Sequence, residues 1–119
     1  MGLDPEERLN FQIIIRSLSL NIPIILSTHI IEDISNLCSH VIFMKDNEIK
    51  HIGEIEKIVS CISNKVYSCN IEHLKEIKEN IKIRYIDNTM ARVISNHELN
   101  YSFLKQEKEE IYDLYYYLN

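Results

Sequence analysis

A helical repeat of apolar side chains opens the chain. Asp4 can accept a backbone N–H as a helix cap, and Pro5 suits the first helical position. Asn21 is a suitable stop. The pattern therefore predicts a helix between these positions with one buried face. Its apolar positions follow the i, i+3, i+4, i+7 spacing: Phe11, Ile14, Ile15 and Leu18.

An uninterrupted apolar run follows at residues 22–28. Ile24, Ile25 and Leu26 are consecutive, which is typical of a parallel strand covered by helices on both faces. Pro23 fits only the beginning of such a strand or an edge. A second amphipathic helix is expected over residues 30–38, with these positions inward: Ile30, Ile31, Ile34, Leu37 and Cys38.

A β-hairpin is expected next. Residues 41–44 predict a short buried strand, and residues 49–52 predict the returning strand. Asn47 can adopt the left-handed conformation that the intervening turn needs. Gly53 separates the hairpin from a short helix over residues 54–62.

A domain boundary is predicted near residues 63–64, which gives units 1–63 and 64–119. The second unit reads as a smaller α+β unit whose predicted strands alternate apolar and polar positions. Residues 105–110 are read as the solvated first turn of the last helix, which carries Ile111, Leu114, Tyr115 and Leu118 at helical spacing. The expected elements before it are a strand at 66–71, a helix at 72–80, and strands at 81–85 and 90–95 that form a hairpin.

Composition indicates an ordinary soluble globular chain, with 45% hydrophobic and 26% charged residues. The net charge is −5 and no Lys/Arg block stands out, so nucleic acid is not an expected partner. Cys38, Cys61 and Cys69 are odd in number and form no Cys-x-x-Cys pair, which favours a reducing, cytoplasmic location. No apolar run is long enough to span a bilayer, so membrane association would come through a partner protein.

Two groupings of reactive side chains suggest chemistry but lack the required spacing. Ser27, His29 and Asp33 could form a hydrolase triad, yet no Gly-x-Ser-x-Gly elbow is present. A metal site is conceivable, but its spacing matches no standard zinc pattern. Its members would be His29, Glu32, Cys38 and His40.

Several short motifs resemble the second half of the ATPase subunit of ABC transporters. Gly2-Leu3-Asp4-Pro5 resembles the D-loop, and Ser27-Thr28-His29 resembles the end of the last core strand with its switch histidine. Residues 41–53 resemble the hairpin that follows, and residues 64–69 and 110–117 resemble the accessory region of ABC-2 type exporters. The expected fold class is therefore α/β: the C-terminal part of a P-loop NTPase (ABC ATPase) sheet, followed by a small α+β accessory unit.

The resemblance implies a role for each matching residue in a complete subunit. His29 would be catalytic and reach the γ-phosphate and the attacking water, where an imidazole can stabilise developing charge. Asp4, with Gly2 and Leu3, would face a partner subunit and link two ATP sites, while also capping its own helix. The complete subunit would use ATP and magnesium, and it would power export through a membrane permease at the cytoplasmic face. That permease would set the transported substrate.

The departures from the family pattern are equally informative. The 119 residues hold no Gly-x-x-x-x-Gly-Lys-Ser/Thr loop, no Leu-Ser-Gly-Gly-Gln-like signature and no apolar strand that ends in Asp-Glu. A histidine and an aspartate cannot replace the backbone cradle and lysine of the phosphate loop. The chain alone is therefore expected neither to bind nor to hydrolyse ATP, and to hold no metal or cofactor by itself.

Two classes of function remain open at this point. The chain is read first as part of an ATPase that is completed by an N-terminal half or a second ATPase subunit. It would then be a truncated reading frame, a remnant, an expression fragment or half of a split enzyme. The alternative is a non-catalytic interaction or regulatory module derived from such an ATPase. The DNA upstream of Met1 discriminates between them, because a disrupted phosphate-loop sequence there would favour the first.

Overall fold

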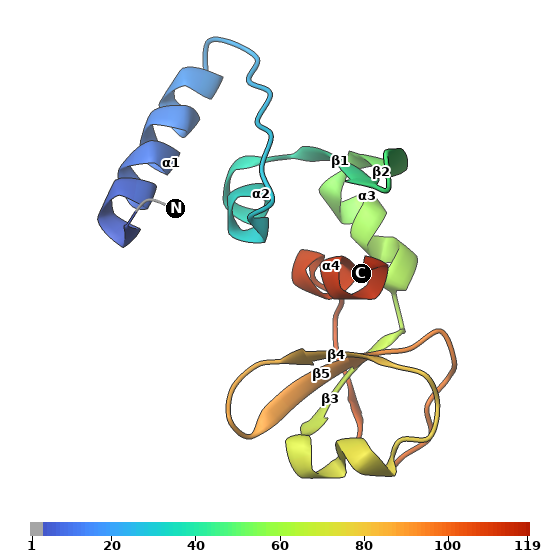
Figure 1. Cartoon of the computed structure of the whole chain (residues 1–119). Coiled ribbons are helices and arrows are strands. Elements are labelled where there is room, and N and C mark those ends of the chain that lie inside the picture. Colours follow the sequence, from blue (N-terminus) through green and yellow to red (C-terminus); the bar gives the residue numbers. More distant parts are fainter. Residues whose placement is uncertain (1–3) are drawn as a thin grey trace. The chain divides into compact units, whose positions relative to one another are not determined.

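The computed structural model describes residues 4–119, and the chain divides into two compact units after Glu54 (Figure 1). The division lies before the predicted boundary at residues 63–64 because the helix that follows Glu54 packs against the last helix of the chain. Gly2 and Leu3, two of the expected site residues, lie outside the described residues. The chain has a mixed α/β structure with two antiparallel sheets.

The first unit contains two helices and a hairpin: α1 (Pro5–Ser19), α2 (Ile31–Leu37), β1 (His40–Lys45) and β2 (Glu48–Glu54). The predicted start of α1 is confirmed, because the Asp4 carboxylate accepts the Glu7 N–H at 2.8 Å. Its predicted buried face is only partly correct, since Ile14 and Leu18 are exposed. A helix of about two turns, such as α2, covers only one side of α1.

The predicted strand at residues 22–28 is wrong. Residues 23–28 are extended but belong to no sheet, and no backbone hydrogen bond joins residues 23–27 to any part of 4–119. The Ile25 side chain is 100% exposed. An apolar run becomes a strand only where another strand pairs with it, and both sheets of the described chain are built from later residues. The expected parallel part of an ATPase sheet is therefore absent from residues 4–119.

The predicted β1–β2 hairpin is confirmed. Asp46 and Asn47 form its turn with φ angles of 55° and 61°, the left-handed pair that a two-residue hairpin turn requires. Gly53 has φ 142°, a value that suits glycine. The expected burial of the first strand is wrong, because Ile42 and Met44 are more than half exposed.

The second unit is a four-stranded antiparallel sheet with the order β4-β5-β3-β6. Figure 1 shows α4 on one side of this sheet and the 3₁₀ segment η2 on the other. The predicted hairpin of β4 and β5 is confirmed. The elements are α3 (Ile55–Val59), η1 (Ser60–Ile62), β3 (Val66–Asn70), η2 (Ile71–Glu76), β4 (Lys82–Tyr85), β5 (Met90–Ile94), β6 (Lys105–Gln106) and α4 (Ile111–Leu118).

Two sequence predictions for this unit are corrected. The helix expected over residues 72–80 is the shorter 3₁₀ segment η2. Residues 105–110 are not a helical turn, because Lys105 and Gln106 pair with β3 as the edge strand β6. A run of mixed charges fits an exposed edge strand as well as a helix end.

A buried carboxylate fastens α4 to the sheet. Asp113 is fully buried, and its oxygens accept hydrogen bonds from Arg84 at 3.0 Å and from Arg92 at 2.9 and 3.0 Å. Asp113 also accepts the Glu110 N–H at 2.9 Å and so caps its own helix. Arg84 and Arg92 face each other across β4 and β5. Arg84 and Arg92 thus support α4 and are largely shielded from water.

The opposite face of the sheet carries a compact apolar core. Its buried members come from β3, β5 and the connecting loops, with partly buried apolar side chains packed around them. The core consists of Tyr67, Cys69, Ile77, Val93 and Leu99.

Candidate functional site

Asp4 lies at the exposed N-terminus of α1. Its carboxylate oxygen holds the Glu7 N–H, and its backbone carbonyl accepts the Arg8 N–H at 2.9 Å. The structural role as a helix cap is therefore established. The second expected role, in contacting a partner subunit, stays a prediction.

His29 lies at the end of the extended segment that links α1 to α2. Its side chain is exposed and makes no hydrogen bond or ion pair with residues 4–119. The residues on either side of it are held firmly, because the Ile30 N–H donates to the Thr28 hydroxyl at 3.0 Å. The imidazole is thus presented to solvent from an anchored turn.

Asp33 forms the best-connected polar cluster of the first unit. Its carboxylate is nearly buried and accepts from Arg8 Nη2 at 2.5 Å, Gln12 Nε2 at 3.4 Å and the Thr28 hydroxyl at 3.2 Å. These partners come from α1 and from the segment before α2. Arg8 and Gln12 were not among the site residues expected from the sequence; their i, i+4 spacing on the polar side of a helix was the available signal.

The hydrolase triad hypothesis is not supported by this geometry. All hydrogen bonds of the Asp33 carboxylate go to Arg8, Gln12 and Thr28, and none goes to His29. Ser27 is exposed and makes no hydrogen bond within residues 4–119. A nucleophile, its base and the group that orients the base must be hydrogen-bonded in series, so this segment lacks the required arrangement.

The metal-site hypothesis finds no support either. Among residues 4–119, no group of three or more His, Cys, Asp or Glu side chains could hold a metal ion. Burial, and then the negative charge of Asp33, raise the pKa of the Cys38 thiol. A raised pKa keeps this thiol protonated at neutral pH, whereas a metal ligand must be a thiolate.

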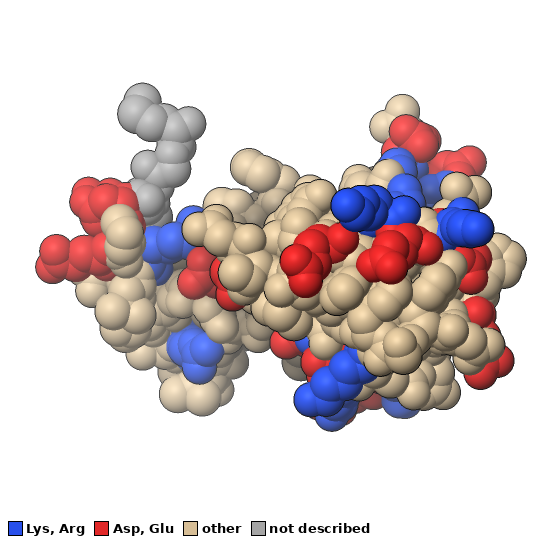
Figure 2. Space-filling view, turned by 90° about the horizontal axis from the view of Figure 1, so that it is seen from below, with Lys and Arg blue, Asp and Glu red and all other residues tan. Residues whose placement is uncertain are grey.

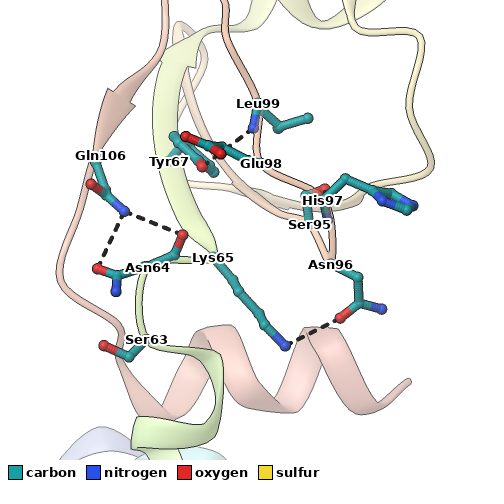
Figure 3. Close-up of a pocket in the computed structure, with 10 residues that line it drawn as sticks. All are labelled: Ser63, Asn64, Lys65, Tyr67, Ser95, Asn96, His97, Glu98, Leu99 and Gln106. Carbon is teal, nitrogen blue, oxygen red and sulfur yellow. Dashed lines mark hydrogen bonds between the residues drawn. The ribbon is translucent and has the colours of Figure 1, made fainter.

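The second unit carries a polar hollow of about 560 Å³ beside β3 and the loop after β5 (Figure 3). Its polar side chains bond one another: Lys65 Nζ lies 3.4 Å from Asn96 Oδ1, and Gln106 Nε2 donates to the Asn64 carbonyl at 3.2 Å. One cation, Lys65, and one carboxylate, Glu98, line it. With one charge of each sign, this hollow favours no particular ligand.

Charges of both signs lie next to each other on the surface. Figure 2 shows Lys and Arg side chains interspersed with Asp and Glu on the face that it presents. Such mixing gives little electrostatic attraction for a polyanion at that face. No helix within residues 4–119 is long and apolar enough to cross a membrane.

The first unit exposes an unusual number of large apolar side chains. They occur on α1, along the extended segment and on the hairpin, and the most exposed are Leu20, Ile25, Met44 and Ile52. Covering one such side chain is worth about 1.5–3 kcal/mol, so leaving several in water favours association. We expect the isolated chain to self-associate through the extended segment, where backbone groups are unpaired.

Sedimentation velocity over a concentration series measures this association. We expect the Ile25→Lys variant to shift the distribution towards monomer, because a charge at a strand edge opposes pairing. Ile25→Val is the matched control and should associate like the parent chain. A parent chain that stays monomeric at every concentration would contradict the prediction.

Comparison with known proteins gives a partial similarity. The uncharacterized ABC transporter ATP-binding protein YxlF of Bacillus subtilis (strain 168) is 27% identical to this chain over 75 residues. The matched region covers 63% of this chain and 25% of that protein, so the chain spans about a quarter of the relative's length. No family model matches the sequence, and no solved structure matches it. The similarity supports a relationship to the ABC ATPases.

Proposed function

We propose that this chain belongs to the C-terminal part of an ABC transporter ATP-binding protein, of the exporter type, and that it acts together with the part of the ATPase that carries the phosphate-binding loop. The similarity to the B. subtilis ATP-binding protein is the observation that carries the proposal. The exposed position of His29 at the end of an extended apolar segment supports it. ATP and magnesium would bind only in the assembled protein.

Each candidate residue has a role in this proposal. His29 donates a hydrogen bond to the transferring phosphoryl group, where a fixed donor acts on developing charge. Asp4 caps α1 and, together with Gly2 and Leu3, contacts the second ATPase subunit. The transported substrate is selected by a membrane permease. None of these roles requires the chain to bind nucleotide alone.

The exposed apolar surface of the first unit supports the need for a partner. Residues 23–27 are extended without backbone partners in the described chain, and Ile25 is fully exposed. A strand from another polypeptide would satisfy these backbone groups and cover the side chain. The N-terminal half of an ATPase core, with a free sheet edge, would supply such a strand.

A hybrid ATPase tests the proposal. In this protein, residues 1–54 of the present chain replace the equivalent segment of the B. subtilis relative. We expect the purified hybrid to hydrolyse ATP within about tenfold of the relative's rate, because its phosphate-binding part is intact. The 119-residue chain is the matched control and should show neither binding nor hydrolysis of ATP. A folded but inactive hybrid would argue against the proposal.

A second candidate function is a non-catalytic regulatory module. The observation in its favour is that nearly all buried apolar residues of the described chain lie in residues 55–119, where a complete core has formed. Such a unit could act by protein contact alone. An active hybrid that requires His29 would exclude this alternative for the first unit.

A further inference from the structure

Asp33 connects two parts of the first unit that carry the candidate site residues. Asp4 begins α1, and His29 follows Thr28 in the segment before α2. The Asp33 carboxylate bonds α1 through its oxygen Oδ1 and Thr28 through Oδ2. One side chain thus joins the helix of one candidate residue to the turn of the other.

The Thr28 hydroxyl is the second part of this connection. It donates to Asp33 at 3.2 Å and accepts the Ile30 N–H at 3.0 Å, so its donor and one acceptor site are both used. Both bonds begin at Thr28, directly before His29, and end at residues that follow His29 in the sequence. The hydroxyl therefore fixes the backbone from which the imidazole projects.

The α1 side of the connection is strong and specific. Arg8 Nη2 lies 2.5 Å from Asp33, and both side chains are largely buried, whereas its second neighbour Glu32 is exposed and 3.9 Å away. A charge-assisted hydrogen bond shielded from water contributes more to stability than an exposed ion pair. Breaking it leaves a buried carboxylate without its cation, so α1 and Asp33 are expected to move together.

We propose that Asp33 is the positioning residue for His29 and transmits movements of α1 to the imidazole. This inference rests on the proposed function for the meaning of His29, but the connection itself exists in the chain alone. A partner that displaces Asp4 and α1 would then also shift His29, which couples contact between subunits to the chemistry. Asp33 touches no nucleotide in this account and acts only through Thr28.

Hydrogen exchange and ¹⁵N relaxation of the 119-residue chain test the connection without any nucleotide. Thr28→Val removes the hydroxyl while keeping the shape of the side chain. We expect hydrogen exchange of the Ile30 amide to accelerate about tenfold, because the stability contributed by one net hydrogen bond is lost. Thr28→Ser retains the hydroxyl and should restore protection to within about twofold. Equal exchange in the two variants would overturn the proposal.

Two arginine variants test whether movement of α1 reaches His29. Arg8→Ala removes the bond to Asp33, and we expect the order parameter of the His29 amide to fall below about 0.6. Arg16→Ala is the matched control, because Arg16 also joins α1 to α2, through the Asn36 carbonyl, but does not touch Asp33. The same response in both variants, or none in either, would overturn transmission through Asp33.

Two further features keep the test decisive. Amides of α1 and α2, which pack against each other, report whether the helical part of the first unit remains folded. If Arg8→Ala unfolds it, the Thr28→Val and Thr28→Ser pair still tests the Thr28 part of the connection. An inactive hybrid ATPase would count against the proposed function and leave these results unchanged. Unchanged exchange in Thr28→Val would count against Asp33 alone.

Discussion

Replacing Asp113 with alanine is expected to destabilise the second unit by about 3–5 kcal/mol. The carboxylate is fully buried and joins Arg84 and Arg92 to α4. Without it, two guanidinium groups face a site that no longer offers a counter-charge, and the N-terminus of α4 loses a cap. A domain of this size has about 5–15 kcal/mol of stability in total, so much of the unit would unfold at physiological temperature.

Tyrosine fluorescence during urea denaturation measures this effect cleanly. All seven tyrosines lie in residues 55–119 and the chain has no tryptophan, so the signal reports on the second unit only. Glu56→Ala is the control, because that carboxylate is exposed on α3 and makes no hydrogen bond or ion pair in the described chain. An Asp113→Ala variant as stable as this control would show that the arginine contacts contribute little.

The second large effect concerns His29 in the hybrid ATPase. We expect His29→Ala to lower kcat by about 10²–10³, the usual cost of removing one fixed donor that stabilises developing charge. KM for ATP should change little, because the imidazole acts on the transition state more than on the bound nucleotide. His29 is exposed and its side chain makes no hydrogen bond with residues 4–119, so its replacement is not expected to affect folding.

Steady-state ATP turnover of the purified hybrid provides the measurement. His40→Ala is a matched control, since His40 is likewise exposed in the first unit. Within residues 4–119, its side chain bonds only to the neighbouring Ser39 hydroxyl. We expect this variant to keep the parent rate. Equal ATP turnover rates for His29→Ala and His40→Ala would contradict the assignment of His29 as the switch histidine.

Local signals in the sequence predicted the local structure well. The Asp4 cap, the Asn47 turn and the last helix all depend on residues that are close in the sequence, and each is confirmed. The predicted strand at residues 22–28 was wrong because a strand depends on residues that are distant in the sequence. Its apolar run indicates burial but contains no information on whether a pairing strand is present.

The polar clusters could not be predicted from the sequence. Asp33 contacts Arg8 from 25 positions away, and Asp113 contacts Arg84 from 29 positions away. Alternation predicted the strand β4, and the α4 carboxylate that contacts Arg84 and Arg92 was not expected. Periodicity shows which positions share a face, and it does not show what lies against that face. His29 was found only through a resemblance to a family motif.

A structure of the hybrid ATPase with ADP and vanadate tests the central claim most directly. The claim is that His29 belongs to the phosphoryl-transfer site of an ABC ATPase. We predict that an imidazole nitrogen of His29 lies about 2.6–3.2 Å from a vanadate oxygen, which is hydrogen-bond reach. An occupied vanadate site with His29 turned to solvent, beyond that reach, would contradict the account.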